Sequence, residues 1–402
     1  MRVRKVLVLS HWSISDPLTT ATLFPTMRVL KDLGVKEQVL LTIERDPLPD
    51  IPAKLSWVTE HLPWRASALR PKPLARAVDM LGVAFSAARK VRAMPADLMV
   101  ARGSIAGGYA HLVSKLTGVP YVVESYEPHA SYMVDCGEWE PGSLLHRSAA
   151  LLERAQKRHA AFLLPVSHGY GRVLIAEGVP EERVLVVPCP VDLVAMRYDP
   201  VARERVRARL GVKQGDLLGI YLGKFGGLYL DTEAFRLFAH VHRRFGERFH
   251  MLVLTPTDRA KVLARCTEAG IPADHCHVAK VPHEEVPEYL SASDLAFATY
   301  RQTPSSAFLS PVKVGEYWAN GLPVLLVRGV GDESGIIEAH PEAGALIRPD
   351  GMDLEAALDR LASVLVPGRN PSVSGLAVST RSLSRTQLAY ERIMQGLSAA
   401  HD

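Results

Sequence analysis

Short apolar runs rich in β-forming residues alternate with segments of helical periodicity along almost the whole chain. The apolar runs predict strands at 4–10, 38–43, 97–101, 119–124, 162–166, 184–188, 217–222, 250–254, 276–280, 294–298 and 323–327. The helical patterns fall near 20–33, 74–93, 105–117, 143–160, 168–177, 230–245, 257–269, 284–291, 312–320 and 353–366. This alternation predicts parallel sheets with helices on both faces. Because there are about twice as many strands as one sheet needs, we expect an α/β chain of two doubly wound, Rossmann-like domains that face a central cleft.

The boundary between the two domains is predicted at the segment Pro188-Cys189-Pro190, where two prolines make a stiff, non-helical connection. We therefore expect one domain over 1–190 and a second over 191–379. Residues 367–371 form a loop rich in glycine and proline. After it, apolar side chains mark one face of a last helix, about 380–402, which we expect to pack on the first domain.

Composition excludes several classes of protein. The 402 residues include 47 basic and 43 acidic ones, a net charge of +4, which is too small to predict a nucleic-acid partner. No apolar run approaches the length of a membrane span, and the N-terminal apolar run is too short for a signal sequence. Four scattered cysteines without a Cys-x-x-Cys pair favour a reducing compartment and predict no metal site. We expect a cytoplasmic protein.

One segment is strongly basic. Seven lysines and arginines but only one acid, Asp79, fall between Arg65 and Arg92, with Trp64, Leu81, Phe85 and other apolar residues interleaved. Such a segment can lie on an anionic membrane surface, here the inner face of the membrane. The alternative is an ordinary solvated face of a helix.

The segment 310–325 predicts a short helix between a loop and a buried strand. Ser310 is a suitable N-cap and Pro311 suits the first helical position, with Val312 next, while Gly321 ends the helix. Free N–H groups at a helix start favour an anion. Lys313 and Glu316, three residues apart, share one face of this helix. They predict either a site for a phosphate and a sugar hydroxyl or an ordinary surface pair of charges.

Four motifs in order resemble the GT-B glycosyltransferases, most closely glycosyltransferase family 4. They are a strand that ends at Ser167, the segment 184–192 ending in Asp192, the glycine loop 221–227, and the segment 310–325 with Glu316, Ala319, Gly321 and Pro323. The resemblance implies that the first domain binds the acceptor and the second the nucleotide-sugar donor. It implies a glycosyltransferase of the hexosyltransferase kind that acts in polysaccharide biosynthesis, with a nucleotide-diphosphate sugar as donor substrate and no separate cofactor.

The resemblance also implies roles for individual residues. Glu316 is expected to hold the ribose hydroxyls, and Lys224 and Lys313 the diphosphate. Backbone groups of the glycine loop and of the helix start would complete the donor site, namely those of Gly223, Gly226, Ser310, Pro311 and Val312. The chain contains no Asp-x-Asp motif, so the lysines would replace a metal ion in neutralising the diphosphate.

The sequence departs from the family pattern just before the helix. The family often has an acid eight positions before the ribose-binding glutamate, and here that position is Phe308, with Ser305 and Ser306 nearby. The nucleotide end of the site is therefore better supported than the sugar end.

Candidates for chemistry in the first domain follow its strands. Glu127 and His129 lie in a polar loop after the strand 119–124, and His129 resembles the family histidine that touches the donor sugar. His11 and Asp16 follow the first strand; Asp16 is either a base that deprotonates the acceptor or a helix cap. Arg102 is either an anion contact or a surface arginine.

The main hypothesis is thus transfer of a sugar from a nucleotide-diphosphate sugar to a glycan or lipid-linked glycan, with retention and without metal. Two alternatives stay open. One is a GT-B nucleotide-sugar epimerase, and the other is a non-catalytic protein that binds nucleotide sugars, for which Phe308 is the motive.

Overall fold

The computed structural model describes residues 3–16, 18–45, 57–70, 72–366 and 368–399. The chain divides into two compact units. The N-terminal unit comprises residues 1–190 and 383–402, and the C-terminal unit comprises residues 191–382. Pro17, Pro71 of the basic segment and residues 400–402 of the expected last helix lie outside the described residues.

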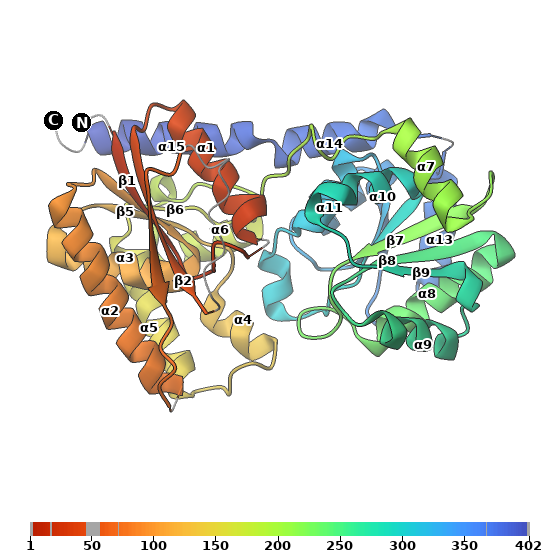
Figure 1. Ribbon diagram of the computed structural model, residues 1–402, viewed down its shortest axis with the longest axis horizontal. Coiled ribbons are helices and arrows are strands. Elements are labelled where there is room, and N and C mark those ends of the chain that lie inside the picture. Colours follow the sequence, from red (N-terminus) through yellow and green to blue (C-terminus); the bar gives the residue numbers. More distant parts are fainter. Residues whose placement is uncertain (1–2, 17, 46–56, 71, 367, 400–402) are drawn as a thin grey trace. The chain divides into compact units, whose positions relative to one another are not determined.

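The N-terminal unit is built on one parallel sheet of six strands (Figure 1). Its strands lie in the order β3-β2-β1-β4-β5-β6. Their bounds are β1 Lys5–Ser10, β2 Glu37–Glu44, β3 Glu60–Arg65, β4 Leu98–Arg102, β5 Tyr121–Glu124 and β6 Phe162–Leu163. The central strands are buried on both faces, as expected of a parallel sheet between helical layers.

Helices cover both faces of this sheet. They are α1 Phe24–Asp32, α2 Lys72–Ala93, α3 Gly103–Thr117, α4 His129–Asp135, α5 Leu144–His159, α6 His168–Ala176 and α15 Leu383–Ala399. A one-turn π-helix, Thr19–Leu23, leads into α1. Helices α1 and α15 pack together on one face, whereas α3 packs on the other face between α2 and α5 (Figure 1).

The C-terminal unit repeats the same arrangement. Its parallel sheet has the order β12-β11-β10-β7-β8-β9. The strands are β7 Leu217–Leu222, β8 Phe249–Leu254, β9 Cys276–Ala279, β10 Leu295–Ala298, β11 Val324–Val327 and β12 Gly344–Ile347. The helices are α7 Pro200–Leu210, α8 Thr232–Phe245, α9 Arg259–Ala269, α10 Val286–Ala292, α11 Val312–Ala319, α12 Glu333–Ala339, α13 Leu354–Val364 and α14 Pro371–Arg381. One core joins the sheet to α7, α10, α11 and α14, and the other joins it to α8, α9 and α13.

Each sheet has a topological switch point, where the chain order along the sheet reverses. In the N-terminal unit it lies between β1 and β4, and in the C-terminal unit between β7 and β10. Ligands of open α/β sheets bind beside the carboxyl ends of the strands at such a point. The loops after β1, β4, β7 and β10 are therefore the places to look for a site. The predicted fold class, two doubly wound Rossmann-like domains, is confirmed.

One strand prediction is wrong, and two strands were not predicted. Residues 184–188 are extended but form no strand, because Pro165 and Pro188 have no N–H to continue a ladder with β6. Strand β3 was not predicted, because it is an edge strand that contains Pro63 and several polar residues. Strand β12 has four residues and follows a short 3₁₀ turn, so it gives little periodic signal.

The end of the chain forms two helices rather than one. Helix α14 ends at Arg381, Ser382 is extended, and α15 begins at Leu383. Through Tyr390, Ile393 and neighbouring residues, α15 joins the hydrophobic core of the N-terminal unit. Among the described residues, no helix is long and apolar enough to cross a bilayer.

Candidate active site

The glycine loop begins where β7 ends, at the switch point of the C-terminal unit. Gly223 and Gly226 have positive φ angles of 126° and 82°, which only glycine adopts readily. The hydroxyl of Tyr221 donates a hydrogen bond of 2.7 Å to the carbonyl of Lys224, which fixes the loop over the end of the strand. The side chain of Lys224 is exposed, so it is free to meet a ligand.

Helix α11 begins after β10, on the other side of the same switch point. Its Tyr317 accepts a hydrogen bond from the N–H of Leu222 and donates one to the carbonyl of Phe297, at 3.0 and 3.2 Å. This phenol therefore ties α11 to the ends of both strands that flank the switch point. Gly321 ends the helix with φ of 76°, as predicted.

The start of α11 differs from the prediction by one residue. The helix begins at Val312, and Pro311 occupies the cap position with a non-helical ψ of 109°. Ser310 is not the N-cap: its hydroxyl accepts a hydrogen bond from the guanidinium of Arg381 instead. The first N–H groups of the helix are left without intrahelical partners, as at any helix start.

Lys313 is the most unusual side chain of the unit. Its ammonium is buried and has no hydrogen-bond partner among the described residues. The rings of Tyr229, Tyr221 and Tyr300 surround it, with centroids 4.0, 5.0 and 5.4 Å from Nζ. Cation–π contacts offset only part of the cost of burial. Burial consequently lowers the pKa of Lys313 to about 7, against an opposing effect of the Glu316 carboxylate.

Gly223 brings the loop and the helix together. A Cβ atom placed on Gly223 would lie 2.9 Å from Nζ of Lys313, so the backbone of the loop passes directly over the ammonium. The two motifs that the sequence assigned to the diphosphate thus meet at one point within one unit. The sequence could not give this contact, since 90 residues separate its two members.

We expect Gly223→Ala to lower the free energy of unfolding by about 1–2 kcal/mol, because alanine is strained at this φ and displaces the Lys313 ammonium. Gly335→Ala is the matched control. It places a Cβ in open space within α12 and should be neutral or slightly stabilising. Urea unfolding of both variants measures the difference, and equal stabilities would contradict the close approach.

Glu316 lies on α11 one turn beyond Lys313 and is mostly buried. Its Oε1 lies 2.8 Å from Nε2 of His283, which precedes α10. This hydrogen bond raises the pKa of His283 above its ordinary value. His283 was not predicted from the sequence, because a single histidine in a short 3₁₀ turn belongs to no recognisable motif. The carboxylate of Glu316 is therefore oriented before any ligand binds.

The segment before α11 contains Phe308, Ser305 and Ser306 within a short 3₁₀ helix, Pro304–Phe308. Ser306 is buried, and its hydroxyl donates to the carbonyl of Thr303 at 2.7 Å. This serine therefore shapes the loop, and Phe308 stands at the position where the resembling family often has an acid.

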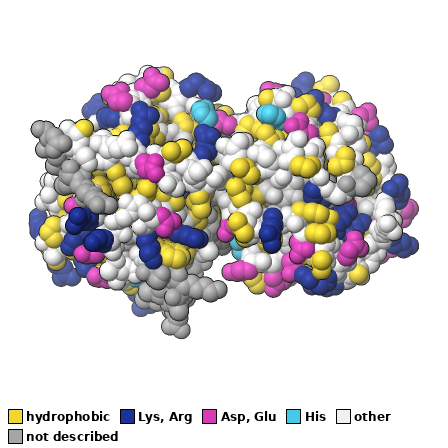
Figure 2. Space-filling model, turned by 90° about the horizontal axis from the view of Figure 1, so that it is seen from above, with side chains coloured by type: hydrophobic (Ala, Val, Ile, Leu, Met, Phe, Trp, Pro, Cys, Tyr) yellow, Lys and Arg dark blue, Asp and Glu magenta, His cyan; other side chains and the backbone are white. Residues whose placement is uncertain are grey.

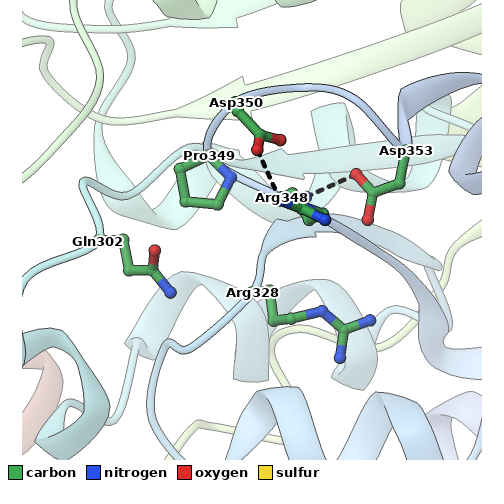
Figure 3. A pocket seen from close by; sticks show the side chains of 6 residues that line it. All are labelled: Gln302, Arg328, Arg348, Pro349, Asp350 and Asp353. Carbon is green, nitrogen blue, oxygen red and sulfur yellow. Dashed lines mark hydrogen bonds and ion pairs between the residues drawn. The ribbon is translucent and has the colours of Figure 1, made fainter.

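A surface hollow of about 550 Å³ lies at the carboxyl ends of β10, β11 and β12 (Figure 3). Its arginines are already paired, Arg328 with Glu338 and Arg348 with Asp350. The hollow is open to solvent, and its lining residues are Gln302, Arg328, Arg348, Pro349, Asp350 and Asp353. The buried, unpaired charge of Lys313 makes the switch point the stronger candidate for anion binding.

In the N-terminal unit the polar loop after β5 is folded around His129. Nδ1 of His129 lies 3.2 Å from Oε1 of Glu127, while Nε2 is buried without a partner among the described residues. The adjacent N–H of Ala130 donates to the carboxylate of Glu153 at 2.9 Å, which anchors the start of α4. The two predicted residues thus form one hydrogen-bonded pair.

The loop after β1 places His11 beside this pair. The rings of His11 and His129 have centroids 6.5 Å apart. Burial, followed by the charge of His129, lowers the pKa of His11 to about 3, so its imidazole is neutral. Asp16 accepts a hydrogen bond of 2.8 Å from the N–H of Leu18 and so caps the turn into the next helix. Its catalytic role stays a prediction.

Arg102 is neither a free anion contact nor a surface arginine. It is buried and forms an ion pair with Glu124, whose other oxygen accepts a hydrogen bond of 2.7 Å from Tyr390 of α15. Burial opposes its charge, but Glu124 and then Tyr126 raise its pKa. Arg102 therefore joins the ends of β4 and β5 to α15 and has a structural role.

The remaining two family motifs are caps. Ser167 is the N-cap of α6 and accepts from the N–H of Tyr170. Asp192 accepts hydrogen bonds of 3.0 and 2.9 Å from the N–H groups of Val194 and Ala195. Ser167 therefore stabilises the start of α6, and Asp192 stabilises the turn just after the domain boundary.

Comparison with known proteins agrees with the fold. Residues 25–190 match the family described as a glycosyl transferase 4-like domain. Curated proteins contain no match to the chain.

Three solved structures illustrate the similarity of fold. Sucrose-phosphate synthase of Thermosynechococcus elongatus is 14% identical with a TM-score of 0.76, covering 99% of this chain and 100% of that one. The HepE protein of Anabaena in complex with UDP-glucose is 15% identical with a TM-score of 0.70, covering 98% and 99%. A UDP-GlcNAc 2-epimerase of Neisseria meningitidis bound to UDP-GlcNAc is 10% identical with a TM-score of 0.61, covering 97% and 100%.

The twin parallel sheets have the GT-B fold that the resemblance implied, and the match over residues 25–190 is to a glycosyl transferase 4-like domain. The structural similarity at these low identities establishes the fold.

Proposed function

We propose that the protein transfers a sugar from a nucleotide-diphosphate sugar to a glycan or lipid-linked glycan acceptor, with retention and without a metal ion. The observation that supports this most is the buried ammonium of Lys313, which has no hydrogen-bond acceptor among the residues that the structure describes and lies at the start of α11 beneath the glycine loop. A cation kept in this state favours an anionic ligand.

Lys313, Lys224 and the start of α11 would act on the leaving group. As the bond between the sugar and the diphosphate breaks, negative charge grows on the leaving phosphate oxygens. Fixed cations and a helix N-terminus lower the energy of that charge where it develops. They would fulfil the role that a metal ion has in other transferases, and activity that persists in EDTA would agree with this.

Glu316 would accept hydrogen bonds from the ribose hydroxyls, with His283 holding its carboxylate in place. Glu127 and His129 would contact the donor sugar or the acceptor, and Asp16 would contact the acceptor. Retention rests on the family resemblance, and NMR of the anomeric proton in the product tests it.

Thermal unfolding with UDP, GDP, ADP and CMP tests the donor site first, because a ligand that binds the folded state raises Tm by mass action. UDP is the first candidate, since the similar HepE structure contains UDP-glucose. No shift with any of the four nucleotides would contradict the proposed function.

Glu316→Gln should weaken binding of the preferred nucleotide about tenfold to a hundredfold, because the amide is a poorer acceptor for ribose hydroxyls. The variant should also lose the raised pKa of His283, which can be followed by NMR. In the wild type, the pair stabilises the fold at acidic pH and loses this effect as pH rises through the raised histidine pKa. Glu338→Gln, which alters an exposed pair with Arg328, is the control and should leave binding unchanged. Unchanged binding in Glu316→Gln would show that the ribose assignment is wrong.

The epimerase alternative draws on the His129–Glu127 pair, because epimerisation needs proton transfer at the sugar. Incubation with the donor but without acceptor separates the two activities. A new nucleotide sugar would identify an epimerase, whereas product that forms only with acceptor would identify a transferase. Tight donor binding without either product would identify the non-catalytic alternative.

A further inference from the structure

Helix α2 of the N-terminal unit has an exposed apolar stripe. Leu74, Val78, Leu81 and Phe85 are between 41% and 66% exposed, although side chains of this kind are usually buried. Their spacing of four, three and four residues places them along one side of the helix. The opposite side, which includes Val83, Ala87 and Val91, is buried. The stripe is therefore not part of the core of the unit.

Positively charged residues follow this apolar stripe on the same side of α2. Arg89 and Arg92 follow Phe85 at the same helical spacing and are exposed. The only acid of α2, Asp79, is engaged elsewhere, since its carboxylate accepts hydrogen bonds from the indole of Trp64 and the N–H of Ser67. The outer side of α2 thus presents an apolar half and a cationic half without a carboxylate.

Helix α5 shows the same pattern. Its Leu144 and Leu151 are 77% and 62% exposed. The exposed cations among them are Arg147, Arg154 and Arg158. Its only acid, Glu153, is buried and bonded to the N–H of Ala130. Because α3 packs against both helices, α2 and α5 belong to one layer on one face of the sheet.

The other face of this sheet, with α15, differs. Figure 2 shows that acidic and basic side chains are interspersed over that side of the molecule. Exposed leucines and arginines are thus combined on the outer sides of α2 and α5, and the acids beside these helices, Glu60 and Glu177, are paired with Lys90 and Lys157. Leucine and phenylalanine side chains partition into the acyl boundary of a bilayer, and arginines reach the lipid phosphates.

We propose that α2 and α5 dock the protein on the surface of an anionic lipid bilayer. This inference goes beyond the proposed sugar transfer, because it concerns a surface of the N-terminal unit that contains none of the candidate site residues. Docking would keep the enzyme at the surface where lipid-linked acceptors are found.

Co-sedimentation of the full chain with vesicles tests the proposal without any sugar donor. We expect binding to vesicles that contain phosphatidylglycerol, weak binding to pure phosphatidylcholine, and a loss of binding as salt rises. Arg89→Glu/Arg92→Glu should weaken binding at least about thirtyfold, and Leu81→Glu/Phe85→Glu should weaken it about as much.

Leu388→Glu on α15 is the matched control, since Leu388 is exposed to a similar extent as Leu81 but lies on the other helical layer. It should leave vesicle binding unchanged. Circular dichroism confirms that each variant is folded. The proposal would be overturned if the protein did not bind anionic vesicles, or if the wild type and both double variants bound them equally well. It would also be overturned if the substitutions abolished self-association or binding to another protein but left lipid binding unchanged.

Discussion

Replacing Lys313 with methionine is expected to stabilise the protein while it weakens nucleotide-diphosphate binding. The free energy of unfolding near neutral pH should rise by about 1–3 kcal/mol, because a buried ammonium that has no hydrogen-bond partner in the described part of the chain is replaced by an apolar chain of similar length. The affinity for the nucleotide should fall about a hundredfold, because a charge-assisted contact to phosphate is lost. Chemical unfolding and calorimetric titration measure the two effects.

The pH dependence gives an independent signature of the same lysine. The folded side chain loses its proton near pH 7, whereas the unfolded one keeps it up to the ordinary value of 10.5. Unfolding therefore takes up a proton between these values, and wild-type stability rises with pH across that window. Nucleotide binding requires the charged form, so affinity should fall about tenfold per pH unit above 7. The methionine variant should lack both slopes.

Lys224→Met is the matched control, because this lysine belongs to the same site but its side chain is exposed. It should weaken nucleotide binding without any gain in stability. If Lys313→Met lowered the stability instead, the cation–π contacts of Lys313 with Tyr221, Tyr229 and Tyr300 would stabilise the fold by more than the burial of the charge costs. If it left nucleotide binding intact, the switch point would not be the diphosphate site.

The sequence was a good guide to the strands that flank each switch point and a poor guide to the sheet edges. Central strands such as β1 and β7 are buried on both faces and therefore read as continuous apolar runs. Strand β3 pairs with β2 over six residues, yet Pro63 and its charged neighbours hide it. Edge strands are stabilised by pairing with a strand that is distant in the sequence. The hydrophobic pattern of a short segment does not show which strand that is.

The candidate site divides in the same way. Lys313, Glu316 and the glycine loop were predictable, because a helix start and a tight turn have local sequence requirements. The three tyrosines around Lys313, and also His283, were not predictable, since they come from β7, the loop after it, the segment after β10 and the turn before α10. Ser310 shows the limit of local rules: its position suits a cap, but a distant arginine engages its hydroxyl. The tertiary hydrogen bond from Arg381 thus takes the place of the local helix cap at Ser310.

Arg381 leads to the second large expected effect. Its guanidinium is almost fully buried, forms an ion pair with Glu333 at the start of α12, and donates to Ser310 before α11. Its stem packs on α11, since a Cβ at Gly315 would lie 3.1 Å from Cγ of Arg381. Arg381→Met should lower the free energy of unfolding by about 3–5 kcal/mol, because it leaves the Glu333 carboxylate buried without its partner.

A double-mutant cycle separates this cause from a general packing defect. Glu333→Met alone should cost a similar amount, whereas Arg381→Met/Glu333→Met should recover most of the loss, because no charge is then left buried. Arg328→Met, which breaks an exposed pair with Glu338, should cost less than about 1 kcal/mol. Losses that simply add in the double variant would refute the pairing. If the recovered double variant still binds nucleotide weakly, Arg381 is also a positioning residue, which holds Ser310 and the start of α11 where the diphosphate is proposed to bind.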